Sequence, residues 1–191
     1  MGRDKALVEV AGRPMARIAA DALAAAGATR VCCIGGDTAA LTALGLEVVA
    51  DRHPGEGPLG GLLTAFADPS AAPDEPVMVL TCDLPGVDAT VVAAVVARLL
   101  GDVDVDVAAP TAAGRPQLLT AAYRPDRVLP VARQAFDTGA RAVRAGLTGL
   151  RIAEVTGIAA ERIDDADTPD DLRRWVRPDR TGVDLPPSGQ G

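Results

Sequence analysis

Aspartates that follow apolar runs are the residues of this chain with the clearest chemical use. Asp83 ends an apolar run that begins at residue 77 and is stopped by Pro85. In an open α/β sheet, ligands bind beyond the carboxyl ends of the strands, where such a carboxylate could hold Mg²⁺ together with phosphate oxygens. Asp83 could equally do no more than start a turn before the proline. The residue types alone leave both interpretations open.

A glycine-rich loop is the second feature with possible chemistry. It contains Gly57, Pro58, Leu59, Gly60 and Gly61 and opens a predicted helix, so that backbone N–H groups could approach a ligand closely. Just before this loop, Asp51 follows the apolar run 47–50. Its carboxylate could accept a hydrogen bond from a base or ribose, or could be a solvated loop acid. His53, the only histidine, has no partner at metal-ligand spacing and is expected to be exposed.

Two further charged residues qualify as site candidates. Lys5 is the only lysine among nineteen Lys and Arg side chains, and a compact ammonium can reach between phosphate oxygens. Asp165 lies in the acidic segment 164–171. Helix capping by Thr168 and Pro169 explains most of this segment, but it does not require Asp165. We therefore expect that Asp165 can face the same cleft as Asp83.

The elements that must position these residues alternate between apolar runs and stretches of helical period, which predicts an α/β fold with a mainly parallel sheet. We expect a three-layer Rossmann-like fold, with one domain over residues 1–176 and a disordered tail over 177–191. The predicted strands are 7–10, 30–34, 47–50, 77–81, 105–109, 118–123 and 151–155. The predicted helices are 15–26, 38–44, 60–66, 89–100, 127–137 and 169–176, with Trp175 folded onto the core.

Bulk properties exclude several classes of function. A net charge of −7 and a pI near 4.7 do not suit broad binding to nucleic acid or to anionic membranes. No apolar run reaches the roughly 20 residues of a membrane span, and the charged start does not suit a secretory signal. We therefore expect a cytoplasmic protein. Cys32, Cys33 and Cys82 show no metal-type spacing and are expected to be reduced and mostly buried.

Four motifs in order give the chain a family resemblance. They are Arg3-Asp4-Lys5, the Gly-Pro-Leu-Gly-Gly loop, Thr-Cys-Asp-Leu-Pro around Asp83, and Asp-x-Asp-Thr-Pro-x-Asp-Leu from Asp165. Together they resemble the molybdenum cofactor guanylyltransferase family over residues 1–176. The stretch 114–118 is similar to that family's arginine-proline segment, which leads into the acceptor side.

The resemblance implies a reaction and a role for each site residue. The enzyme would transfer GMP from GTP to molybdopterin, releasing pyrophosphate, with Mg²⁺ as cofactor and a molybdoenzyme or cofactor chaperone as a partner. Lys5 would bind phosphates, Asp51 and the loop 57–61 would border the nucleoside, and Asp83 would hold the metal. Asp165 is the second candidate metal ligand.

Two departures from the family pattern shape the expectations. The family's signature begins Leu-Ala-Gly-Gly-x-Ser-x-Arg before the position of Met1, so we expect its first strand and phosphate loop to be missing here. The sheet should then show either a gap beside 77–81 or that gap closed by rearranged strands. Asp165 and Asp167 also replace an Asn-x-Asn pair. A molybdopterin cytidylyltransferase, a phospholactate or phosphoenolpyruvate guanylyltransferase, and a non-catalytic truncated binding domain therefore remain alternatives.

Overall fold

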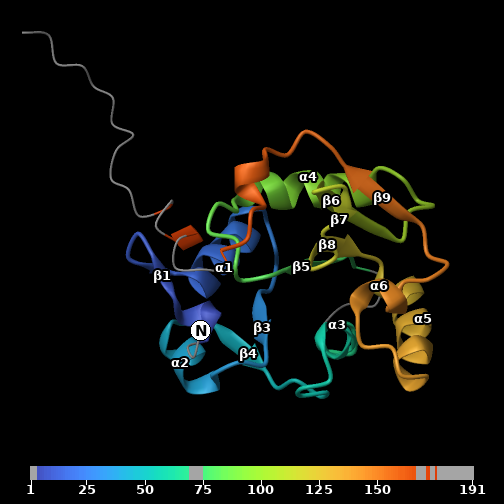
Figure 1. Cartoon of the computed structure of the whole chain (residues 1–191), viewed down its shortest axis with the longest axis horizontal. Coiled ribbons are helices and arrows are strands. Elements are labelled where there is room, and N and C mark those ends of the chain that lie inside the picture. Colours follow the sequence, from blue (N-terminus) through green and yellow to red (C-terminus); the bar gives the residue numbers. More distant parts are fainter. Residues whose placement is uncertain (1–3, 69–74, 167–170, 173–174, 176–191) are drawn as a thin grey trace, which may run out of the picture.

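The computed structural model describes residues 4–68, 75–166, 171–172 and 175. Helices cover both faces of a central sheet (Figure 1). On one face, α4 (Ala89–Leu100) packs against the strands and against α1 (Met15–Ala25). On the other face lie α3 (Pro58–Phe66), α5 (Pro125–Asp137) and the short α6 (Val143–Gly146). The predicted three-layer α/β fold is confirmed.

The larger sheet contains β5 (Val77–Leu80), β8 (Thr120–Tyr123), β6 (Val107–Ala112), β7 (Arg115–Pro116) and β9 (Ile152–Val155). Strand β8 runs antiparallel to both β5 and β6, whereas β9 pairs with β6 in parallel. Because β5 and β6 both oppose β8, they run parallel to each other and end at the same edge. The sheet is more mixed than the expected mainly parallel one.

Alternating side chains of this sheet form two cores. Ala108 and Ala122 face α4, whereas Val107 and Tyr123 on the neighbouring positions face α3 and α5, the period of two that a strand imposes. Tyr123 is fully buried, and its hydroxyl donates a hydrogen bond to the carbonyl of Leu118. Helices therefore cover both faces of the sheet at β6 and β8, whereas Ile152 and Glu154 of β9 are exposed.

A second, two-stranded parallel sheet is made by β3 (Cys32–Ile34) and β4 (Glu47–Val49), with α2 (Thr38–Ala43) between them in the chain. Among the described residues, neither β3 nor β4 forms a ladder with β5, which pairs only with β8. The side chains of β3 and β5 are half-buried throughout, in contrast to the fully buried β8. On its side away from β8, β5 has no strand partner among the described residues, which is one of the two outcomes expected beside 77–81.

The N-terminal segment differs from its prediction. In place of a strand over 7–10, Lys5–Leu7 forms a 3₁₀ turn, and only Glu9–Val10 (β1) is a strand, paired with Arg13–Pro14 (β2). The carboxylate of Asp4 caps the turn by accepting a hydrogen bond from the N–H of Ala6 at 3.1 Å. A capping hydrogen bond between residues close together in the chain thus outweighs the apolar pattern that predicted a strand.

Other boundaries shift by a few residues. α3 begins at Pro58 rather than at residue 60, and α5 begins at Pro125, because proline suits the first turn of a helix. The short elements β2, β7, α6 and the 3₁₀ turn Ala160–Arg162 were not predicted.

The C-terminal expectations are covered only in part. Trp175 packs on the core as expected, directly over Gly86. The rest of the last helix and the expected tail 177–191 lie outside the described residues. None of the described helices has the length and apolarity that a membrane crossing needs.

Candidate active site

The ends of β3, β4 and β5 bring the predicted site residues to one edge of the structure. Gly35 and Gly36 follow β3, and a Cβ atom on Gly35 would lie 3.3 Å from the Cβ of Asp51, which follows β4. A Cβ atom on Gly36 would lie 3.7 Å from a carboxylate oxygen of Asp4, the residue that caps the turn of Lys5. The half-buried Lys5 is therefore on the same edge as Asp51.

Asp83 stands at the end of β5 and is joined to the segment of Asp165. The backbone carbonyl of Asp83 accepts a hydrogen bond from the N–H of Ala166 at 2.9 Å, and Asp165 directly precedes Ala166 in the chain. One carboxylate oxygen of Asp83 accepts the Thr81 hydroxyl at 2.7 Å. Asp83 is half-buried and Asp165 is exposed. The structure thus brings Asp165 and Asp83 into one region, whereas Asp167 lies outside the described residues.

Cys82, between the strand and Asp83, is not a nucleophile. Burial raises the pKa of its thiol to about 11, and the negative charges of Asp83 and Asp4 act in the same direction. The thiol is therefore protonated at neutral pH and weakly reactive. All three cysteines are half-buried rather than mostly buried.

Asp51 serves the loop that follows it. Its Oδ1 accepts hydrogen bonds from the N–H of His53 at 2.9 Å and from the hydroxyl of the fully buried Thr64 at 3.1 Å. The same hydroxyl lies 3.1 Å from the carbonyl of Gly60, so Asp51 is tied to the start of α3. The simple picture of a solvated loop acid is therefore wrong. Both hydrogen bonds to the Asp51 carboxylate use its Oδ1.

The glycines of the loop have different structural reasons. Gly57 has a φ of +85°, in the region that favours glycine. A Cβ atom on Gly60 would lie 2.7 Å from the Cβ of His53, so the histidine ring can lie close only because Gly60 has no side chain. Gly61 has neither reason, because a Cβ atom there would meet nothing within 4 Å. A close approach by a ligand would explain Gly61.

The N-terminus of α3 does not offer the free N–H groups that the sequence suggested. Pro58 has no N–H, the N–H of Leu59 binds the carbonyl of Arg141 at 3.1 Å, and the N–H of Gly60 binds the carbonyl of Gly57 at 3.1 Å. The first turn of this helix is thus internally satisfied. The loop can border a ligand through its surface but is a poor phosphate cradle.

His53 was predicted to be exposed, and this prediction is wrong. Its ring packs against Phe136 of α5 with the ring centroids 4.7 Å apart, and only 25% of its side chain is exposed. The sequence signal that could have indicated this is the glycine at position 60, which makes room for the ring. Within the described part of the chain, no three His, Cys, Asp or Glu side chains gather as metal ligands.

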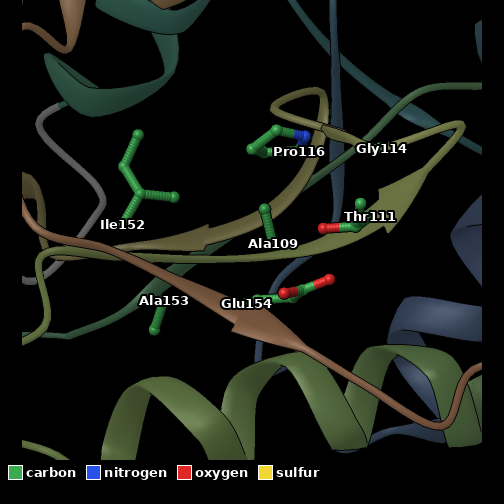
Figure 2. A pocket seen from close by; sticks show the side chains of 7 residues that line it. All are labelled: Ala109, Thr111, Gly114, Pro116, Ile152, Ala153 and Glu154. Carbon is green, nitrogen blue, oxygen red and sulfur yellow. The ribbon is translucent and has the colours of Figure 1, made fainter.

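A pocket of about 380 Å³ lies on the larger sheet, between the β6–β7 hairpin and β9 (Figure 2). It is lined in part by Thr111, Gly114, Pro116, Ile152 and Glu154. Figure 2 shows the Glu154 carboxylate and the Thr111 hydroxyl on neighbouring strands. Neither Thr111 nor Glu154 was predicted from the sequence as a site residue. The 114–118 stretch was the only signal in the sequence for this region.

Solved structures share this architecture. Molybdopterin-guanine dinucleotide biosynthesis protein A from Archaeoglobus fulgidus matches with a TM-score of 0.71 at 20% identity, covering 92% of this chain and 90% of that one. The CMP:2-keto-3-deoxy-manno-octonic acid synthetase complexed with CTP gives 0.70 at 19% identity and 89% coverage of both chains. 2-C-methyl-D-erythritol 4-phosphate cytidylyltransferase from Thermus thermophilus gives 0.65 at 19% identity, covering 90% and 91%. At these identities the likeness shows the fold.

Sequence comparison supplies the family. A search of curated proteins gives no match. The profile of the MobA-like NTP transferase domain, however, matches residues 1–152, which is most of the chain and includes Lys5, Asp51, the glycine-rich loop and Asp83. The chain therefore belongs to the MobA-like NTP transferase family and is a nucleotidyltransferase.

Proposed function

We propose that this nucleotidyltransferase transfers GMP from GTP to molybdopterin, giving molybdopterin guanine dinucleotide and pyrophosphate. The observation that carries the proposal is the place of these residues at strand ends: Asp51 and the turn of Lys5 lie beside the end of β3, and Asp83 follows β5 next to the segment of Asp165. The similarity to the molybdopterin-guanine dinucleotide biosynthesis protein of Archaeoglobus fulgidus supports this choice of substrates.

Mg²⁺ is the cofactor that these residues suit. Asp83, and Asp165 from the segment that is hydrogen-bonded to it, would supply hard carboxylate oxygens, and Mg²⁺ is commonly held by one or two carboxylates together with substrate phosphates. The Thr81 hydroxyl fixes the orientation of Asp83 through one of its oxygens. When bound, the ion would neutralise negative charge on the nucleotide phosphates.

The remaining residues would bind and orient the substrates. An oxygen of the molybdopterin phosphate attacks the α-phosphorus of GTP, the bond to the β-phosphate oxygen breaks, and pyrophosphate leaves. Lys5 stabilises negative charge on the phosphates. Asp51 and the surface of the loop 57–61 border the nucleoside. No step needs a nucleophile from the protein, in agreement with the protonated thiol of Cys82.

The pocket between the β6–β7 hairpin and β9 is the candidate acceptor side. Gly114 and Pro116 belong to the stretch that the resemblance places there, and Arg115 between them is exposed. An arginine at this rim suits an anionic acceptor, since its guanidinium can pair with a phosphate group. We expect the reaction to take place in the cytosol.

Cytidylyl transfer is the second candidate. Asp165 replaces an asparagine of the guanylyl pattern, and the resulting Asp-x-Asp resembles the pattern of related cytidylyl enzymes. Two similar structures are a synthetase complexed with CTP and a cytidylyltransferase. Phospholactate and phosphoenolpyruvate are alternative acceptors for the same site.

Release of pyrophosphate from the purified protein tests the proposal. GTP, CTP, ATP and UTP are each combined with molybdopterin, phospholactate or phosphoenolpyruvate in the presence of Mg²⁺. GTP with molybdopterin should give the highest rate, and Asp83→Asn should lower it by about 100-fold or more with little change in melting temperature. A higher rate with CTP would replace the guanylyl assignment. Full activity of Asp83→Asn would show that Asp83 is not part of the active site.

A further inference from the structure

The glycine-rich loop is held in place from outside by the connection between α5 and α6. The carbonyl of Arg141 accepts the N–H of Leu59 at 3.1 Å, which binds the first turn of α3 to this connection. A Cβ atom on Gly57 would lie 3.1 Å from the same carbonyl oxygen. The backbone of Arg141 therefore fits directly against the loop.

The side chain of Arg141 adds a second set of contacts. Its guanidinium donates to the carboxylate of Glu56 at 2.9 Å and to the carbonyls of Phe136 and Ala140 at 2.9 and 2.8 Å. It also lies over the ring of Phe136, 4.1 Å from the centroid. Glu56 directly precedes the loop and Phe136 belongs to α5, so one guanidinium joins the two segments.

His53 completes this arrangement. Its ring packs on Phe136, and its Nδ1 lies 3.8 Å from the other carboxylate oxygen of Glu56. We call the four side chains of His53, Glu56, Phe136 and Arg141 the loop clamp. Two of them precede the glycine-rich loop directly, and two come from residues more than 70 positions later in the chain.

The loop clamp contributes more to the position of the loop than to the core. The side chains of Arg141 and Glu56 are each 43% exposed, and an ion pair of such exposure stabilises a fold only slightly. The same pair forms a side-chain hydrogen bond that ties the loop to the α5–α6 connection. Losing it should free the loop without unfolding the protein.

We propose that Arg141 is a positioning residue, which holds the loop 57–61 where it can border the nucleoside of the bound nucleotide. The proposal rests on the nucleotide-binding role given to this loop under the proposed function. Arg141 itself needs no contact with substrate. It acts through Glu56, Phe136 and the N–H of Leu59.

Arg141→Ala tests the proposal, with Arg133→Ala as the matched control. Arg133 is an exposed arginine of α5 outside the loop clamp. We expect Arg141→Ala to raise the KM for the nucleotide about tenfold, while kcat and the KM for the acceptor change by less than about twofold. Arg141→Lys should recover part of the loss, because it keeps the charge but not the planar fork. Arg133→Ala should behave as the unaltered protein.

Hydrogen exchange of residues 53–61 in the same proteins separates the possible outcomes. Faster exchange in Arg141→Ala, together with weaker nucleotide binding, supports the proposal. Unchanged exchange shows that Arg141 does not hold the loop, and faster exchange with unchanged KM shows that the position of the loop does not matter for binding. Either result overturns the proposal.

The proposed function has its own readout in this experiment. One outcome is that GTP with Mg²⁺ slows exchange around Lys5 and Asp83 but not in residues 53–61. That result would support nucleotide binding but contradict the roles proposed for the loop and for Arg141. If GTP slows exchange in neither region, the proposed function itself fails.

Discussion

Asp51, which we propose borders the nucleoside, also has a structural part in the fold. Its Oδ1 holds the hydroxyl of Thr64 and the N–H of His53. The contacts orient the side chain before any ligand arrives, which lowers the entropy that binding would cost. The sequence predicted a carboxylate at a strand end but not its partners, because Thr64 is thirteen residues away on the next helix.

The glycines separate into those that the fold needs and one that it does not. Gly57 needs its positive φ, and Gly60 makes room for His53. The sequence predicted the loop as a unit, since four glycines in seven residues are visible in the letters. Which glycine serves packing depends on contacts made by distant residues, and only the structure shows them.

Gly61→Ala should stabilise the protein and weaken nucleotide binding. A glycine inside a helix costs about 1 kcal/mol relative to alanine, and the added Cβ of Gly61 would meet no atom within 4 Å. We expect the melting temperature to rise by roughly 2–4 °C. If the nucleoside packs against this position, the Kd for GTP should rise about tenfold, as for a methyl group forced into a filled site. Calorimetric melting and titration measure both.

Gly60→Ala is the matched comparison. Its Cβ would lie 2.7 Å from the Cβ of His53, so this variant should be less stable than the unaltered protein. A Gly61→Ala protein that is more stable and binds GTP with unchanged affinity would show that Gly61 does not border the nucleoside.

Short hairpins are the elements that sequence patterns missed. The β1–β2 and β6–β7 connections each use two residues with positive φ, Ala11-Gly12 and Ala113-Gly114. Such turns usually carry Asn-Gly or Asp-Gly, and alanine in the first position gives no signal. Strands of two residues are also too short to show a period of two. The helix α4 was predicted to the residue, because its apolar period, its capping Asp88 and the closing Gly101 agree.

The alanine at position 113 should limit the stability of the β6–β7 hairpin. It has a φ of 48°, a left-handed conformation that costs an L-residue about 1–2 kcal/mol and that asparagine tolerates better. We expect Ala113→Asn to stabilise the protein by about 0.5–1 kcal/mol and to raise the melting temperature by roughly 1–4 °C. Ala113→Val should have the opposite effect, because a β-branched side chain is disfavoured at positive φ. Thermal melting followed by circular dichroism checks both signs, and a drop in stability with asparagine would contradict the turn argument.

At the scale of the whole molecule, two sheets meet without a shared ladder. β3 pairs with β4 and β5 pairs with β8, and the described residues supply no further partner to either strand. Cys33 of β3 and Cys82, two residues beyond β5, nevertheless pack against the same hydrophobic cluster. Alternating apolar and helical stretches predicted the layers, and the family signature predicted either this gap or its closure by rearranged strands. The antiparallel β8 was not predicted, because the direction of a strand depends on the length and path of its connections and not on its own residues.

Supplying a strand between β3 and β5 should raise both stability and nucleotide affinity. The change places the family's Leu-Ala-Gly-Gly-x-Ser-x-Arg segment and an apolar strand before Met1. One inserted strand could pair with both neighbours, and each backbone group that is otherwise buried without a partner costs about 1–3 kcal/mol, so we expect the melting temperature to rise by roughly 5–10 °C. The added loop would also orient Lys5, which should lower the Kd for GTP about tenfold or more. Calorimetric melting and GTP titration at the same Mg²⁺ concentration compare the extended protein with the 191-residue chain. The control is an extended protein with two prolines in the added strand, because prolines cannot complete the hydrogen-bond ladders. Equal stability and affinity in all three proteins would show that β3 and β5 need no strand between them.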